Sequence, residues 1–411
     1  MATAANPTQD STSIIPFKIQ VSDDQIEHLN KKLALVRLPD ELENAGRDYG
    51  VPLGDIQRLV ARWKSGYDWR THEKQLNDEL PQFQGSIDVE GFGSLKVHFV
   101  HKKSEVENAI PLLFVHGWPG SFVEVRKILP LLTQEIAGQP SFHVVAFSLP
   151  GYGFSEAPKK KGFKINQFAE VGHKLMLSLG YKEYVAQGGD WGSRICQRIA
   201  SLYGGTHCKA WHTNFPLPLD TSLIRNPPTL FSHPWLYLSG RISSYTPAEK
   251  AGLERTAWFI KEGHGYAQEH STQPQTLGYS LADSPVGLLA WIYEKLVNWT
   301  DNYPWDDDEA GPAASLRIYY EFHHETDTDR PKPPTIPAGA SFFPKELHNL
   351  PRKWTRTPYR KFEAEHDSGG HFAAHEKPNE LVQDLRRMFG KGGIAEGIVK
   401  GKTGYKALSR L

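Results

Sequence analysis

The chain has 411 residues, of which 39% are hydrophobic and 23% are charged, and its 47 basic and 47 acidic side chains give a formal net charge of zero. This length allows a large buried core together with a substantial insertion or appended region. The balanced charge excludes the strongly basic surface that is typical of proteins binding nucleic acid or anionic membranes.

Targeting and disulfide signals are absent from the sequence. The N-terminus lacks the basic start and apolar segment of a signal peptide, and no apolar stretch approaches the roughly 20 residues that span a bilayer. Cys196 and Cys208 are too few for a disulfide framework in a chain of this length. We therefore expect a cytoplasmic protein without a transmembrane segment.

The first part of the chain, residues 1–90, is expected to form a separate helical region that packs on the core. Residues 22–37 begin with a Ser-x-x-Gln capping box and carry their apolar side chains on one helical face. A second amphipathic helix is expected over residues 53–63.

From about residue 91 the pattern changes to short β-rich runs that alternate with amphipathic helices. This alternation is typical of a mostly parallel sheet with helices on both faces. Strands are expected at residues 95–101, 110–115, 142–149, 184–186 and 208–215, and helices at 122–129 and 165–179. Residues 91–215 are therefore assigned to the first part of an α/β core.

The alternation stops after residue 215. Residues 216–335 are rich in Pro, Trp and Tyr and include a helix over 247–261 that begins with a capping box. Strand patterns return near Phe342 and at 360–365, followed by a helix over 380–389. We therefore expect a helical lid at 216–335, the second part of the core at 336–390, and a peripheral or flexible C-terminal extension at 391–411.

A glycine-flanked aspartate follows the strand expected at 184–186. In the run GGDWGS, Gly188 and Gly192 stand two residues before and after Asp190, and a helix is expected from residue 194. Small flanking residues allow the sharp strand-to-helix turn on which α/β-hydrolases carry their nucleophile. Because the central residue is Asp, we expect it to form an ester with an electrophilic carbon.

The run HGWPG, residues 116–120, directly follows the strand expected at 110–115. In this kind of fold, the loop after that strand supplies one backbone N–H of an oxyanion hole, and the residue after the nucleophile supplies the other. Trp118 and Trp191 occupy these two positions and are predicted to stabilise a developing oxyanion.

A histidine base and an orienting acid are expected near the end of the chain. In EHDSGGHF, His371 has the favoured position for the base, while His366 is a competitor that lies too close to the strand end. The acid should precede the base at a strand end. Glu346, in SFFPKEL, fits this place, and Asp220, after the strand expected at 208–215, is the alternative; the preference for Glu346 rests partly on the family resemblance described next.

Together, HGWPG, GGDWGS, SFFPKEL and GGHF resemble the epoxide hydrolases of the microsomal type and their soluble fungal relatives, over roughly residues 15–390. The resemblance implies an α/β-hydrolase fold with a helical lid and an N-terminal region that wraps the catalytic domain. It assigns nucleophile, acid and base to Asp190, Glu346 and His371. The sequence differs from the microsomal members in lacking their membrane anchor.

The resemblance also implies two lid tyrosines that donate hydrogen bonds to the epoxide oxygen as the ring opens. A tyrosine remains protonated at neutral pH and so suits this task. Tyr266, in GYAQEHST, matches the first family position. Tyr319, in SLRIYYE, best matches the second, and its neighbour Tyr320 is the alternative.

These features predict an enzyme that hydrolyses apolar epoxides to vicinal diols through an aspartyl ester. Its expected partners are a small apolar epoxide and water, with no metal, no organic cofactor and no nucleic acid, and a homodimer is its candidate assembly. A haloalkane dehalogenase is one alternative, because it uses the same ester chemistry. A catalytically silent lipophile-binding protein on the same fold is the other.

Overall fold

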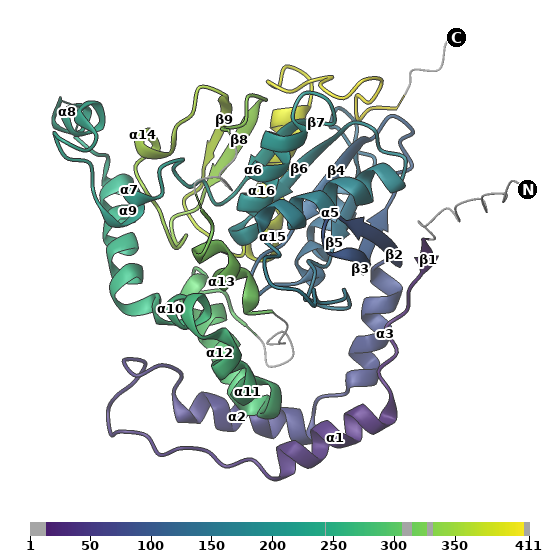
Figure 1. The fold of residues 1–411 in the computed structure, drawn as a ribbon, viewed down its shortest axis with the longest axis vertical. Helices are drawn as coiled ribbons and strands as arrows, with labels where there is room; N and C mark the ends of the chain where they lie inside the picture. Colours follow the sequence, from purple (N-terminus) through teal and green to yellow (C-terminus); the bar gives the residue numbers. More distant parts are fainter. Residues whose placement is uncertain (1–13, 243, 306–314, 327–331, 407–411) are drawn as a thin grey trace, which may run out of the picture.

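A computed structural model describes residues 14–242, 244–305, 315–326 and 332–406. Within these residues, one sheet has the strand order β1-β2-β3-β5-β4-β6-β7-β8-β9 and lies at the centre of the molecule (Figure 1). The strands are β1 (Ile15–Pro16), β2 (Gln82–Val89), β3 (Gly93–Lys102), β4 (Ile110–Val115), β5 (Phe142–Phe147), β6 (Tyr184–Gly188), β7 (Cys208–Thr213), β8 (Ala338–Phe342) and β9 (Arg360–Glu365).

The neighbouring strands β5, β4, β6, β7, β8 and β9 are parallel to one another. At one edge, β3 pairs antiparallel with β5, β2 with β3, and β1 with β2. Every residue of β4 is buried, because helices cover both faces of the sheet. Successive β4 side chains point to opposite faces, so Phe114 packs in one apolar cluster and Val115 in the other. A mostly parallel, doubly covered sheet is therefore present, as predicted.

Four main helices cover the sheet. Helices α5 (Ile165–Ser178) and α6 (Asp190–Tyr203) contribute to the cluster on one face, and α4 (Ile128–Thr133) and α16 (Pro378–Phe389) contribute to the cluster on the other. The continuous helix expected over 122–129 is wrong, because a 3-10 turn, η1 (Phe122–Val125), precedes α4. Pro130 fits this arrangement, since proline is tolerated in the first turn of a helix, where its missing N–H is not needed.

The chain between β7 and β8 is helical. It contains α7 (Ser222–Arg225), α8 (Pro234–Ile242), α9 (Pro247–Trp258), the π-helix η2 (Phe259–Gly263), α10 (Gly265–Thr272), α11 (Pro274–Asp283), α12 (Pro285–Trp299) and α13 (Arg317–His323). The predicted capping box at the start of α9 is confirmed, with Thr246 and Glu249 exchanging side-chain and backbone hydrogen bonds. Short helices α14 (Arg352–Thr355) and α15 (Ala373–Glu376) flank β9.

The N-terminal region contains α1 (Asp23–Ala34), α2 (Leu53–Ser65) and α3 (Trp69–Glu79), and the capping box predicted at Ser22 is confirmed. The expectation that this region lies outside the sheet is wrong, because β1 and β2 extend the sheet at its edge. β2 pairs along its whole length with β3. Its mixed polar and apolar sequence, QFQGSIDV, gives little strand signal until β3 is beside it.

Helices α1 and α2 pack mainly against the lid and not against the sheet. Leu33, Leu59 and Val60 form an apolar cluster with Leu289 and Tyr293 of α12. Figure 1 shows the two N-terminal helices beside α11 and α12 at the bottom of the view. The first part of the chain therefore packs against the side of the lid that faces away from the sheet. One such contact joins Lys32 to Asp283, about 250 residues further along the chain.

The C-terminal extension is more ordered than expected over residues 391–406. Ala395 is 1% exposed and Val399 is 3% exposed, and both join the apolar cluster around α16. The backbone N–H of Gly404 donates to the Asn108 carbonyl oxygen, and the Gly404 carbonyl oxygen accepts a hydrogen bond from the Ser141 N–H. The expectation of a flexible tail is therefore wrong for this part, and residues 407–411 lie outside the described residues.

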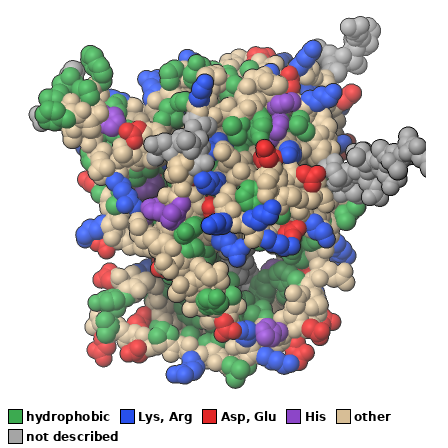
Figure 2. All heavy atoms as spheres, viewed as in Figure 1, with side chains coloured by type: hydrophobic (Ala, Val, Ile, Leu, Met, Phe, Trp, Pro, Cys, Tyr) green, Lys and Arg blue, Asp and Glu red, His purple; other side chains and the backbone are tan. Residues whose placement is uncertain are grey.

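Acidic and basic side chains are mixed over the face drawn in Figure 2, in keeping with the net charge of zero. Among the helices of the described residues, none has both the length and the hydropathy that crossing a membrane requires.

Four fully buried histidines predict that the fold loses stability in mild acid. Burial lowers the pKa to about 3 for His98 and His270 and to about 4 for His116 and His212. The unfolded chain protonates these groups near pH 6.5, so below that pH the unfolded state binds more protons than the folded state. The free energy of unfolding should therefore fall as the pH drops below about 6.5, by at most about 1.4 kcal/mol per pH unit for each histidine.

Urea unfolding between about pH 7 and about pH 5 measures this slope, and replacing His98 with glutamine is expected to flatten it. Exchange of exposed His28 for glutamine is the matched control and should leave the slope unchanged. A stability that does not depend on pH over this range would contradict the prediction.

Candidate active site

The predicted nucleophile turn is present at the end of β6. β6 ends at Gly188 and α6 begins at Asp190, whose φ of 47° lies in the left-handed region. This conformation is strained for a residue with a side chain and is often found at functional sites. A Cβ atom at Gly192 would lie 1.9 Å from the Val115 carbonyl oxygen. The close approach of α6 to β4 therefore requires glycine there.

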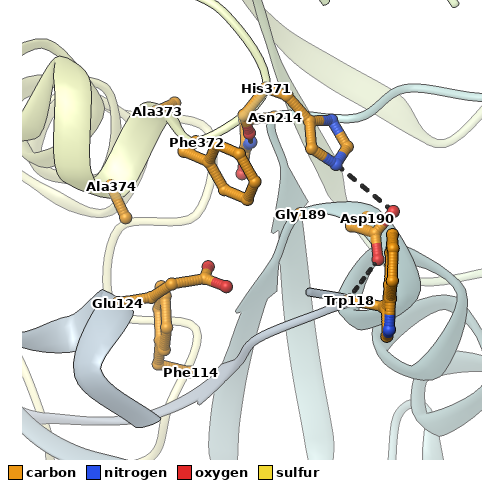
Figure 3. A pocket seen from close by; sticks show the side chains of 10 residues that line it. All are labelled: Phe114, Trp118, Glu124, Gly189, Asp190, Asn214, His371, Phe372, Ala373 and Ala374. Carbon is orange, nitrogen blue, oxygen red and sulfur yellow. Dashed lines mark hydrogen bonds and ion pairs between the residues drawn. The ribbon is translucent and has the colours of Figure 1, made fainter. Parts of the chain in front are cut away.

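Asp190, His371 and Glu346 come together at the carboxyl ends of the parallel strands. His371 Nε2 lies 3.3 Å from Asp190 Oδ2, and His371 Nδ1 lies 2.5 Å from Glu346 Oε1. His371 belongs to the loop after β9, and Glu346 belongs to the loop after β8. Only 3% of His371 and 2% of Glu346 is exposed. Figure 3 shows the His371 ring directed at the Asp190 carboxylate.

The protonation of His371 depends on these two carboxylates. Burial opposes its charge, but the nearby carboxylates of Glu346 and Asp190 outweigh burial and raise the pKa of His371 to about 10. In the free protein at neutral pH, the imidazole is therefore charged and paired with both acids.

The HGWPG loop holds the other oxygen of Asp190. The backbone N–H of Trp118 donates to Asp190 Oδ1 at 2.7 Å. A Cβ atom at Gly117 would lie 2.2 Å from the same oxygen, so a side chain at that residue would displace the carboxylate. His116 fixes the loop, because its Nε2 accepts the Leu149 N–H at 3.1 Å. Trp191 follows Asp190 directly, but no hydrogen bond links its N–H to the Asp190 carboxylate within the described residues.

Tyr266 of α10 and Tyr319 of α13 lie together over the two tryptophans, each with 7% exposure. The Tyr266 ring stacks on Trp118 with centroids 4.9 Å apart and planes at 9°, and Tyr319 meets Trp191 edge to face at 4.8 Å. Burial raises the pKa of both phenols well above the ordinary value, and the Asp190 charge adds to this effect. Both hydroxyls are therefore protonated at neutral pH.

The alternative residues lie elsewhere. Tyr320 is 37% exposed and stacks on His324, with centroids 4.1 Å apart. Asp220 pairs with His233 at 3.0 Å, and the side chain of Asp220 is 52% exposed. His366 pairs with Asp384 at 2.7 Å. None of these contacts includes Asp190, so the geometry favours Tyr319, Glu346 and His371 over these alternatives.

Sequence reasoning missed Glu124 of η1. Its carboxyl group points into a cavity that Asp190, His371, Asn214 and Phe372 also line (Figure 3). Burial, reinforced by the Asp190 charge, raises the pKa of Glu124 to about 8. The sequence around Glu124, eight residues after His116, contains no motif that marks it as a site residue. Its approach to Asp190 depends on how η1 turns back toward the site. Among the described residues, no group of three or more His, Cys, Asp or Glu could hold a metal ion.

Comparisons with known proteins agree with this geometry. A family model described as the epoxide hydrolase N terminus matches residues 14–125, and a model of the α/β hydrolase fold matches residues 110–248. Epoxide hydrolase 1 of the pig, Sus scrofa, is 35% identical over an alignment 416 positions long, gaps included. The alignment covers 92% of this chain and 89% of the relative. The chain belongs to the epoxide hydrolase family. Its enzyme class is thereby that of a hydrolase, and the predicted family membership is confirmed.

Two solved structures support the same assignment for this epoxide hydrolase. The epoxide hydrolase of Aspergillus niger is 33% identical with a TM-score of 0.74, covering 91% of this chain and 95% of that one. The juvenile hormone epoxide hydrolase of the silkworm Bombyx mori is 27% identical with a TM-score of 0.77, covering 91% and 93%. The predicted α/β-hydrolase fold is therefore confirmed.

Proposed function

We propose that this epoxide hydrolase converts apolar epoxides to vicinal diols through a covalent ester on Asp190. One observation carries the proposal. The two oxygens of Asp190 have different partners, with Oδ1 bonded to the Trp118 N–H and Oδ2 facing His371. One oxygen is thus held in an oxyanion site, while the other faces the base and is the one proposed to form the ester.

In the first step, Asp190 Oδ2 attacks an epoxide carbon and the bond from that carbon to the ring oxygen breaks. The oxygen remains attached to the second carbon and takes a proton from Tyr266 or Tyr319 as its negative charge develops. The buried hydroxyls of the two phenols are suited to this task, because they are protonated and shielded from bulk water. The product of this step is a hydroxyalkyl ester of Asp190.

In the second step, His371 takes a proton from water as the water oxygen attacks Cγ of the ester. Forming the ester removes the negative charge of Asp190, which is one of the groups that raise the pKa of His371. The imidazole then releases its proton, which returns to the phenol that donated in the first step, and becomes the base, oriented by Glu346. The oxyanion forms on Oδ1, where the backbone N–H groups of Trp118 and Trp191 receive it. Its collapse breaks the bond from Cγ to Oδ2, and His371 passes its proton to the departing oxygen, which releases the diol. The new carboxyl group then gives its proton to His371, which restores the carboxylate.

The surroundings of Asp190 favour an apolar substrate. Tyr266, Tyr319 and the two tryptophans give the lid side of the site mostly aromatic walls. Such walls gain free energy by burying hydrocarbon and leave the polar contacts to the epoxide oxygen. The five-part domain division, the cytoplasmic location and the homodimer remain predictions.

A single turnover in water enriched in heavy oxygen tests the ester. With enzyme in excess over styrene oxide, the label is expected in the carboxylate of Asp190, because the first diol takes its new oxygen from that side chain. Mass spectrometry of the peptide containing Asp190 and of the diol measures both. Direct labelling of the diol would overturn the covalent route.

A haloalkane dehalogenase is the second candidate, and one observation favours it. The indole N–H groups of Trp118 and Trp191 are buried and lack hydrogen-bond partners within the described residues, so they are available to bind a halide. Release of bromide from bromoalkanes, measured beside diol formation from epoxides, separates the two activities. Epoxide turnover without bromide release is the expected result.

Replacing Tyr266 or Tyr319 with phenylalanine is expected to slow ester formation by roughly 10- to 100-fold, since each change removes one donor to the developing alkoxide. The double variant should lose more than either single variant. Rapid-quench measurement of the ester gives this rate directly. Tyr320→Phe is the matched control on the same helix and should form the ester at the wild-type rate. Equal losses at Tyr319 and Tyr320 would contradict the assignment.

A further inference from the structure

The cavity beside Asp190 is the size of one water molecule. Its volume of about 10 Å³ is close to the minimum that holds a single water. Asp190, His371, Glu124 and Asn214 supply polar groups to its wall. A water in this space would therefore find the two to four polar partners that such sites need.

Glu124 enters this cavity from the side opposite His371. Figure 3 shows its carboxyl group extending from η1 across the open space toward Asp190 and His371. A Cβ atom at Gly120 would lie 1.5 Å from Glu124 Oε1, so the carboxyl group occupies the place that a side chain at residue 120 would take. The Gly117 backbone also acts on the Glu124 carboxyl and favours its charged form. The HGWPG loop thus fixes the position of this acid.

We propose that Glu124 is a positioning residue that holds the water which hydrolyses the Asp190 ester. The water gives one proton to His371 Nε2 and donates its second O–H to a Glu124 oxygen. These two bonds direct a lone pair of the water oxygen at Cγ of the ester. The inference rests on the ester mechanism proposed above.

The charge of Glu124 agrees with this role. The group is held mainly in the neutral form at pH 7, because burial and the negative charge of Asp190 raise its pKa to about 8. The other charged group that faces it is His371, whose influence acts in the opposite direction. From α15 the cavity receives only Ala373 and Ala374 among its lining residues. In the ester Asp190 carries no charge, but burial, the largest cause of the raised pKa of Glu124, remains and still favours the neutral form. A neutral acid orients the water without competing with His371 for its proton.

Two substitutions separate a hydrogen-bonding role from a role in packing. Glu124→Leu keeps the approximate volume and removes the oxygen atoms, whereas Glu124→Gln keeps the shape, the neutral charge and a hydrogen-bonding oxygen. Glu135→Leu makes the same chemical change at a side chain that is 47% exposed and pairs with Lys406, and serves as the control. Rapid quenching in acid during turnover of styrene oxide, followed by intact-mass measurement, gives the rates of ester formation and ester hydrolysis separately.

Glu124→Leu is expected to form the ester at the wild-type rate but to hydrolyse it at least about tenfold more slowly, so that the ester accumulates. Glu124→Gln should hydrolyse it at nearly the wild-type rate. Wild-type hydrolysis by Glu124→Leu, or equal slowing in both variants, would overturn the positioning role. Slowing of both steps in Glu124→Leu would likewise assign the residue to packing.

His371→Gln distinguishes failure of this inference from failure of the proposed function. If the ester accumulates in His371→Gln but Glu124→Leu behaves as wild type, only the role of Glu124 is wrong. If neither His371→Gln nor the wild type forms any ester, the covalent mechanism itself is wrong, and the role of Glu124 falls with it.

Discussion

Asp190→Ala is expected to lose epoxide turnover by roughly 10⁴- to 10⁶-fold, which is the range for removal of a covalent nucleophile. The side chain supplies the atom that forms the ester, and no neighbouring group offers a replacement in the same place. Glu124 is the nearest other carboxyl in the cavity, but its pKa of about 8 leaves it mostly protonated at neutral pH. The measurement is diol production by the purified variant, with intact-mass analysis for any covalent adduct.

Asp220→Ala is the matched control for this change. Asp220 follows β7 in the lid segment, where it contacts Ser222 and His233. Neither of these contacts includes Asp190. We therefore expect normal turnover, apart from a small loss of stability. Near-ultraviolet circular dichroism of both variants checks that the aromatic surroundings of the site are intact. An adduct or substantial diol production in Asp190→Ala would contradict its role as nucleophile.

His371→Gln is expected to trap the ester. The epoxide opens without a base, because the tyrosines supply the proton, so one equivalent of ester should form per active site. Its hydrolysis should slow by roughly 10²- to 10⁴-fold, which is the usual contribution of a positioned general base. Steady-state turnover falls by the same factor. Intact-mass measurement after mixing with styrene oxide detects the adduct, and its decay gives the hydrolysis rate.

His366→Gln tests whether the neighbouring histidine could serve instead. His366 lies five residues earlier, and its Nε2 contacts Asp384, which also accepts a hydrogen bond from Ser341. Loss of this buried contact should cost stability, by about 1 kcal/mol. In His366→Gln the Asp190 ester should be hydrolysed as fast as in the wild type and should not accumulate. Accumulation of the ester in His366→Gln, with normal turnover in His371→Gln, would reverse the assignment.

Much of the core could be predicted because its strands are fully buried. The fully buried apolar run at 110–115 matches β4, and the strand expected at 360–365, in which buried and more exposed residues alternate, matches β9, both residue for residue. β2 was missed for the opposite reason, since its polar and apolar residues are mixed and its pairing with β3 is decided by contacts across the hairpin. The buried tail at Ala395 and Val399 was missed because glycine-rich composition does not reveal docking against α16.

Some residues of the candidate site could also be predicted from local motifs, and others could not. Asp190 and Trp118 lie in short motifs whose glycines are needed locally, because any Cβ at Gly117 or Gly192 would collide with neighbouring atoms. Glu346 and Tyr319 required the family resemblance, since one acid or one tyrosine among many carries little signal. Only the structure separates Tyr319 from Tyr320, because adjacent residues of α13 point in different directions and one is buried while the other is exposed.

The sequence by itself determined the nucleophile turn, the oxyanion loop, the order of nucleophile, acid and base, and the alternation of a doubly covered sheet. These are local features, set by the sterics of glycine and by hydrophobic periodicity. Only the tertiary structure decided that α1 and α2 support α12, that β2 joins the sheet, and that Glu124 shares a water-sized cavity with Asp190 and His371. These relations join segments far apart along the chain, and their free energy comes from burial and charge that exist only once the chain has folded.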